Sequence, residues 1–133
     1  MELSEQGFAG NPDEINLKAL LAAMDIYAQG NYAIAINDFT ELLQGNKVDQ
    51  AYQLNAQFYL GLSYLADEQP TKALEQFAAF EPIKNGALTT TIQWYTALAH
   101  LKNENIGLAK KQLMQLKSSK EYQEQATTLL ENL

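Results

Sequence analysis

The chain has 133 residues, of which 47% are hydrophobic, so it is long and apolar enough to fold as one domain with a buried core. Its formal charge is −7 at pH 7 and its basic residues are all lysines, which argues against nucleic-acid binding, because phosphate recognition needs clustered positive charge and favours arginine. No cysteine is present, so disulfides, thiolate metal sites and thiol nucleophiles are excluded.

The charge is unevenly distributed. Residues 1–81 contain twelve Asp or Glu and three Lys, whereas residues 82–133 contain four Glu and six Lys. We interpret this as two solvated faces, with an electrostatic dipole that orients a partner as the alternative. No apolar run approaches the ~20 residues that cross a bilayer, and no signal peptide is recognisable, so we expect no direct membrane insertion. The compartment stays open between the cytoplasm and an envelope-associated, longer anchored protein.

Apolar residues recur at helical spacing along most of the chain. The pattern predicts a flexible segment over residues 1–12 and seven helices at about 13–29, 31–44, 51–67, 70–81, 88–103, 105–117 and 120–132. Asn11 before Pro12 is a plausible start for the first helix, Pro70 suits a first turn, and Ser118 with Glu121 has the spacing of a capping box. The fold class is therefore all-α.

Three segments of the chain align with one another. Three landmarks, each found once per segment, keep the same separations of 38 and 36 residues; they are Ala23, Gly61 and Ala97, then Ala35, Ala73 and Ala109, then Phe39, Phe77 and Leu113. Each segment reads as two helices joined by a short polar turn. We expect the small residues to allow close helix crossing and Phe39 and Phe77 to fill the gap beyond it.

This pattern resembles the tetratricopeptide repeat (TPR) family of bacterial TPR-domain proteins, over residues ~16–117. In the second segment Leu60-Gly61, Tyr64, Ala73 and Phe77 fall where the family has Leu-Gly, Tyr, Ala and an aromatic residue. In the other segments Ile26 and His100 replace the Tyr, and all segments are longer than the family's roughly 34 residues.

The resemblance implies a single domain over residues 13–133. It would be a right-handed superhelix of three repeats, at about 16–49, 54–85 and 90–117, followed by a C-terminal capping helix within 119–133. The apolar stripe expected of such a cap consists of Tyr122, Ala126, Leu129, Leu130 and Leu133. The first helix is apolar almost all round, so we expect residues 1–10, through Leu3 and Phe8, or a second molecule to cover it.

In the TPR family the first helix of each repeat lines a concave groove. The resemblance carries this lining onto Leu20, Met24, Tyr27, Asn55, Phe58, Tyr59, Leu62, Leu65, Thr91, Trp94, Tyr95, Leu98 and Leu101, of which Leu65, Leu98 and Leu101 could equally be core. Phe58 and Trp94 are one repeat apart, as are Tyr59 and Tyr95, and equivalent residues of stacked repeats lie side by side. The predicted partner site is Tyr27, Asn55, Phe58, Tyr59, Trp94 and Tyr95, with burial in the core as the alternative.

The sequence gives no sign of catalysis. His100 is the single histidine, and we expect it to be structural, with a local hydrogen bond, because no triad or metal shell accompanies it. Phosphate loops, His/Cys metal spacings and nucleophile elbows are missing from the sequence. We therefore expect no enzyme activity, no cofactor and no metal.

The leading hypothesis is a non-catalytic protein-interaction module or scaffold that binds an apolar peptide or helix in the groove. The second is a structural homo-oligomerisation domain, which dimerises through the apolar N-terminal helix. The third is a pocket for an apolar small molecule.

Overall fold

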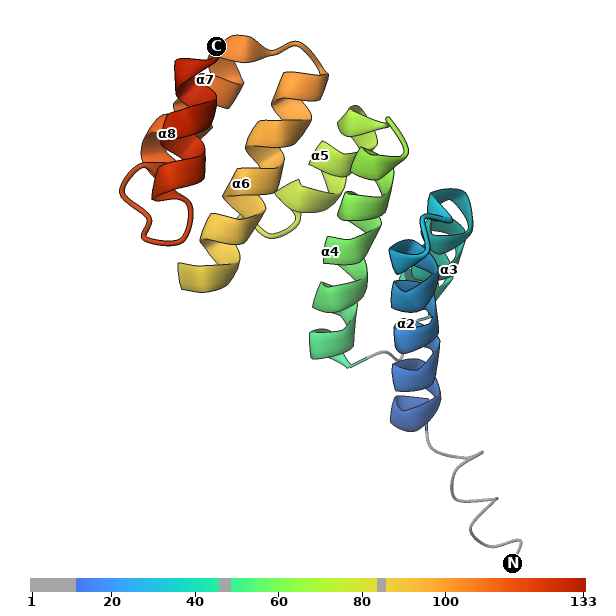
Figure 1. Cartoon of the computed structure of the whole chain (residues 1–133). Coiled ribbons are helices and arrows are strands. Elements are labelled where there is room, and N and C mark those ends of the chain that lie inside the picture. The colour runs from blue at the N-terminus through green and yellow to red at the C-terminus, as the bar shows by residue number, and fades with distance from the viewer. Residues whose placement is uncertain (1–11, 46–48, 84–85) are drawn as a thin grey trace, which may run out of the picture. The chain divides into compact units, whose positions relative to one another are not determined.

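The computed structural model describes residues 12–45, 49–83 and 86–133, and in these residues it contains helices and turns but no strand. The helices are α2 (Pro12–Ala28), α3 (Tyr32–Gln44), α4 (Gln50–Ala66), α5 (Pro70–Ala78), α6 (Gly86–Lys102), α7 (Ile106–Leu116) and α8 (Gln123–Glu131) (Figure 1). The all-α prediction is confirmed, and each helix overlaps its predicted range. The N-terminal segment 1–11, with Leu3, Phe8 and Asn11, lies outside the described residues.

The chain divides into two compact units, residues 1–67 and residues 68–133. The boundary falls between α4 and α5, within the second predicted repeat.

The first unit packs α2, α3 and α4 against one another, with all three pairs in contact. Their shared core consists of Leu20, Ala23, Ala35, Phe39, Leu42, Ala56 and Leu60. The alanines of this core, Ala23, Ala35 and Ala56, are almost fully buried, which lets the helices approach closely around the ring of Phe39.

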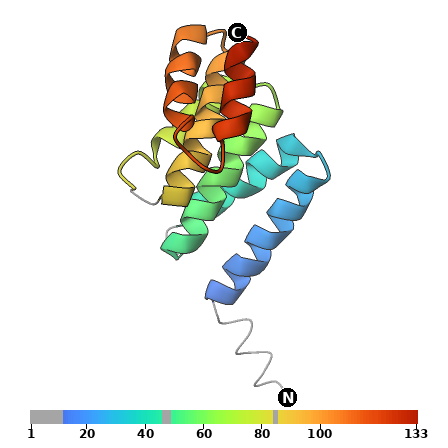
Figure 2. The same ribbon diagram turned by 60° about the vertical axis from the view of Figure 1, so that its left-hand side comes forward.

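The second unit joins α5 to α6, α6 to α7 and α7 to α8 (Figure 2). Ala97 of α6, Leu113 and Leu116 of α7 and Ala126 of α8 form one buried cluster. The apolar stripe predicted for the terminal helix contributes to this cluster, because Tyr122, Leu129 and Leu130 pack against it. Helix α8 therefore contacts α7 as α4 contacts α3 and as α6 contacts α5.

The turn between the two helices of each predicted repeat has one recurring feature, a residue with positive φ. These residues are Gly30 (φ 86°), Glu68 (φ 61°) and Glu104 (φ 60°), and they are 38 and 36 residues apart, the separations of the sequence landmarks. Positive φ is the left-handed region that glycine enters freely and other L-residues enter at a cost. These three backbone positions therefore keep the same separations as the sequence landmarks.

The residue after each positive φ is the N-cap of the next helix, and its carbonyl accepts a hydrogen bond from the N–H four residues later. The backbone N–H of Ala35 donates to the carbonyl oxygen of Asn31 at 3.0 Å, and that of Ala109 donates to Asn105 at 3.0 Å. In the second repeat the N–H of Ala73 donates to Gln69 at 3.1 Å. Each of these alanines is fully buried. The turn therefore places a small residue, four positions after the N-cap, at the close contact between helices.

Two predicted helix ends are wrong. Helix α5 ends at Ala78 and not at 81, because the N–H groups of Ala79, Phe80 and Glu81 donate to carbonyls three residues back and the residue before Pro82 disfavours helix. Helix α8 begins at Gln123 and not at 120. The expected cap Ser118 instead donates its hydroxyl to the carbonyl of Gln115, at 3.2 Å, at the end of α7.

None of the helices in the described ranges is both long and apolar enough to cross a membrane.

Candidate functional site

Three of the four predicted site residues of the first unit, Tyr27, Phe58 and Tyr59, lie together beside its core. The ring of Tyr59 is 5.6 Å from that of Tyr27, 5.9 Å from that of Phe39 and 5.4 Å from that of Phe58. Tyr27 and Tyr59 both pack against the core cluster. Asn55 is exposed, and its side-chain N–H donates to the carbonyl of Ala51 at 2.9 Å.

The predicted site residues of the second unit diverge from each other. Trp94 stacks on Tyr122, with ring centroids 5.3 Å apart and planes inclined by 16°. Its neighbour Tyr95 faces another helix, with its ring 6.4 Å from that of Phe77 in α5. Successive helical residues point about 100° apart, so the two rings serve different contacts. The ladder joining Phe58 with Trp94, and Tyr59 with Tyr95, spans the two units and stays a prediction.

The residues expected at close helix contacts are buried. The set consists of Ala23, Ala35, Phe39, Gly61, Ala73, Phe77, Ala97 and Ala109. Six of them are small residues, as close helix crossing requires.

One pocket lies between α6 and α8 and has a volume of about 420 Å³. Trp94, Leu98 and Leu129 form its apolar wall. Its polar residues are Glu124, Gln125, Thr128 and Asn132. Trp94 is half-buried. Tyr122, on which the indole stacks, also donates its hydroxyl to Thr91 at 3.3 Å. The indole is thus fixed in orientation while part of it remains accessible.

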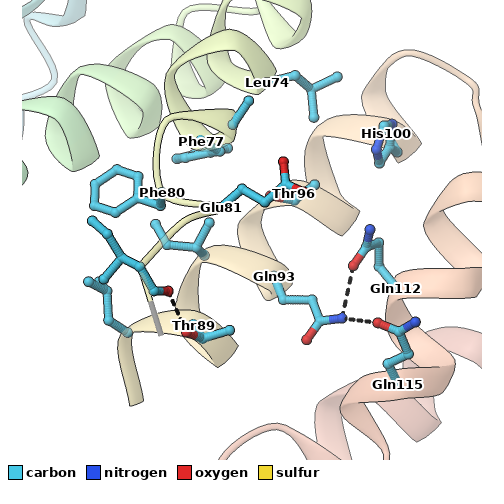
Figure 3. A pocket seen from close by; sticks show the side chains of 14 residues that line it. Leu74, Phe77, Phe80, Glu81, Thr89, Gln93, Thr96, His100, Gln112 and Gln115 are labelled. Atoms are coloured by element: carbon cyan, nitrogen blue, oxygen red, sulfur yellow. Dashed lines mark hydrogen bonds between the residues drawn. The ribbon is translucent and has the colours of Figure 1, made fainter. Parts of the chain in front are cut away.

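A larger pocket, of about 630 Å³, lies between α5, α6 and α7 (Figure 3). The α5 side, with the turn that follows the helix, is largely apolar and includes Leu74, Phe77, Phe80 and Ile83. The side formed by α6 and α7 is largely polar and includes Thr89, Gln93, Thr96, His100, Gln112 and Gln115. The pocket therefore has two chemically different walls.

Three glutamine amides form the centre of the polar wall. The Nε2 group of Gln93 donates to Oε1 of Gln112 at 2.9 Å and also to Oε1 of Gln115 (Figure 3). Both N–H bonds of Gln93 are then used. Its own oxygen and the Nε2 groups of Gln112 and Gln115 make no hydrogen bond within the described residues, so they remain available to a ligand.

His100 stands at the end of this wall. Its Nδ1 atom is buried and has no hydrogen-bond partner among the described residues, so the expectation of a local hydrogen bond is wrong for this atom. Burial lowers the pKa of the imidazole below 6.5, because a charged ring would lose hydration. The ring is therefore neutral at pH 7.

The described residues form neither a relay at Nδ1 of His100 nor a metal-binding group. No carboxylate or nucleophile is hydrogen-bonded to Nδ1 of His100 to form a relay. Across the described ranges no group of three or more His, Asp or Glu could hold a metal ion. What the two pockets offer is apolar surface, ring faces, neutral hydrogen-bonding groups and one carboxylate each, from Glu81 and Glu124.

The polar wall of the larger pocket was not identified from the sequence. Its signal is nevertheless present, because Thr89, Gln93, Thr96 and His100 are separated by four, three and four residues. This spacing places them on one face of a helix. Polar residues at this spacing are also typical of a solvated helix face, so the sequence alone does not distinguish a polar pocket wall from exposed surface.

Compared with known proteins, the chain matches no family model, no curated protein and no solved structure.

Proposed function

We propose that this chain is a non-catalytic protein-interaction domain that binds an apolar peptide or helix of another protein. The observation that carries the proposal is the pocket between α6 and α8, where Trp94 is stacked on Tyr122 and faces Leu98 and Leu129. Tryptophan and tyrosine dominate binding energy at protein interfaces, and a ring held in place loses little entropy when a partner covers it.

We further propose a TPR-like architecture of three repeats and a capping helix, stacked as a right-handed superhelix. The recurring turns at Gly30, Glu68 and Glu104 support it, since the same turn at one period is the mark of a repeat. The similar contacts of α4 with α3, of α6 with α5 and of α8 with α7 support it too. Under this proposal the aromatic residues of the two units form one groove.

The test uses a random peptide library displayed on phage and selected on the whole chain. We expect Trp94→Ala to weaken binding of selected peptides by about 2 kcal/mol or more, because it removes the largest apolar surface of the pocket. Binding is measured by fluorescence polarisation with the resynthesised peptides. Acrylamide should quench Trp94 in the free protein and quench it less when peptide is bound.

The matched control is Met114→Ala, which truncates a large apolar residue that is 57% exposed and lines neither pocket. Its binding should equal that of the wild type. Equal binding by Trp94→Ala, with its helical signal retained, would exclude the pocket between α6 and α8 as the site.

A second candidate function is homo-oligomerisation through α2. Three of its large apolar side chains are exposed, namely Ile15 (49%), Leu17 (37%) and Leu21 (54%). Light scattering separates the candidates, because a monomer at all accessible concentrations excludes this second function.

A further inference from the structure

The larger pocket combines a polar row with an apolar wall. Thr89, Gln93, Thr96 and His100 share one face of α6 and meet Leu74, Phe77 and Phe80 across the pocket. Helices that pack as simple core place apolar residues at such positions. Polar groups that face an apolar wall cost stability unless water or a ligand pairs with them.

The hydrogen-bonding capacity of the row is only partly used. Gln93 retains its oxygen as an acceptor, and Gln112 and Gln115 retain their N–H groups as donors. The hydroxyl of Thr96 makes no hydrogen bond within the described residues. A side-chain amide offers both a donor and an acceptor, which is the combination that an unpaired peptide group can satisfy.

We infer that this pocket binds an extended peptide segment of a partner, with its backbone paired to the glutamines and its apolar side chains against α5. A basic residue of the segment lies near Glu81. This site is distinct from the Trp94 surface, since Trp94 and Thr96 are about 160° apart around α6 at 100° per residue. The inference therefore does not depend on the function proposed for that surface.

The shape of the polar row favours an extended segment over a helix. Thr89 and His100 are eleven residues apart, so at 1.5 Å per residue the row is about 16 Å long. An extended chain of about five residues has the same length. A helical ligand already satisfies its own backbone groups, so it could not use the free amide groups of the pocket.

The charge of the pocket lining indicates that the bound peptide carries a basic residue. Among the described residues that line the pocket, Glu81 is the one that is charged at pH 7, because the other polar groups are amides, hydroxyls and the neutral His100. Glu81 is exposed, so pairing with Lys or Arg contributes selectivity and only modest affinity.

To test this, peptides are selected for binding to the whole chain from a random library displayed on phage. The selected clones are then grouped by the variants of the chain that weaken their binding. We expect a class of clones whose affinity falls about tenfold in Gln93→Ala and is unchanged in Trp94→Ala. These clones should be enriched in Lys or Arg beside apolar residues. Glu81→Gln should weaken them about two- to fivefold, and N-methylation of the peptide backbone should also weaken them about tenfold.

Matched controls keep folding and binding apart. Thr96→Val removes one hydroxyl with little change of shape and should weaken the same clones, even if Gln93→Ala proves unstable. Gln123→Ala and Glu75→Gln change exposed residues outside the pocket and should leave binding unchanged. Clones that depend on Trp94 alone would support the proposed function and overturn this inference. A second result would also overturn the inference: the pocket takes up an apolar dye, but the affinity of no peptide clone changes in Gln93→Ala or Thr96→Val.

Discussion

The same left-handed backbone conformation occurs at three equivalent positions of the described chain, but with different residues. Gly30 adopts positive φ without strain, whereas Glu68 and Glu104 carry side chains there. Glu68 makes an ion pair with Lys102, with Oε2 and Nζ 2.8 Å apart. The backbone N–H of Glu104 donates to the carbonyl of Leu101 at 3.0 Å, but its side chain makes no hydrogen bond or ion pair within the described residues and so does little to offset the strain.

We predict that Glu104→Gly raises the free energy of unfolding by about 0.5–1 kcal/mol, because relief of the left-handed conformation exceeds the added freedom of the unfolded chain. At the equivalent position, Gly30→Ala should lower the free energy of unfolding by about 1 kcal/mol. Backbone strain alone would cause this loss, since an added Cβ would meet no atom within 4 Å. Urea unfolding followed by circular dichroism measures both. A destabilised Glu104→Gly would mean that the Glu104 side chain has a role that its contacts do not reveal.

The single histidine gives a pH dependence of known sign. Burial lowers the pKa of His100 in the folded chain below 6.5, its ordinary value. At a pH between the folded and the unfolded pKa, the unfolded chain therefore binds a proton that the folded chain does not. Stability therefore falls as pH falls through about 6.5 and levels off below the folded pKa.

The measurement is thermal unfolding across this pH range together with NMR titration of the imidazole. His100→Gln should remove the slope near neutral pH, because the carboxylates titrate at lower pH. An imidazole that titrates above 6.5 in the folded protein would contradict the prediction.

At the scale of the elements, the sequence predicts the helices well because each has a long apolar period and a clear break after it. The turns at residues 29–31, 67–69 and 103–105 follow the landmarks of the repeat. The two errors lie where local hydrogen bonds decide the helix end, as at Pro82 and Ser118. The candidate site was only partly predictable, since Trp94 was recognised as a large aromatic residue, whereas its stacking on Tyr122 depends on tertiary packing.

Helix α8 is predicted to be essential for solubility. Its Ala126 packs on Leu113 and Leu116, whose side chains are fully buried. Exposing a buried leucine costs about 1.5–3 kcal/mol, so deletion of residues 119–133 should destabilise the second unit and cause aggregation. Size-exclusion chromatography and thermal unfolding measure this.

The control for this deletion removes Leu133 only, which follows α8 and is 38% exposed. It should leave both stability and solubility unchanged. A soluble monomer of wild-type stability after deletion of residues 119–133 would show that α8 is an appendage and not a cap.

At the scale of the whole molecule, the proposed homo-oligomerisation through α2 makes a prediction about its exposed leucines, Leu17 and Leu21. Should light scattering detect a dimer, Leu21→Lys is expected to shift it to monomer without loss of helix, since a buried unpaired charge opposes association. Ile106→Lys is the control, because Ile106 is a comparably exposed apolar residue on α7 (41%). A dimer that survives Leu21→Lys would exclude α2 as its interface.

The order of contacts along the chain has a kinetic consequence. Within each unit the helices that touch are neighbours in sequence, apart from α2 with α4, which are separated by one helix. Search times are short when native contacts close small loops, and helical proteins of this kind fold in about microseconds to milliseconds. Each unit contains the contacts that a folding nucleus needs, so while the chain is being synthesised the first unit can acquire its structure before the ribosome has completed the second.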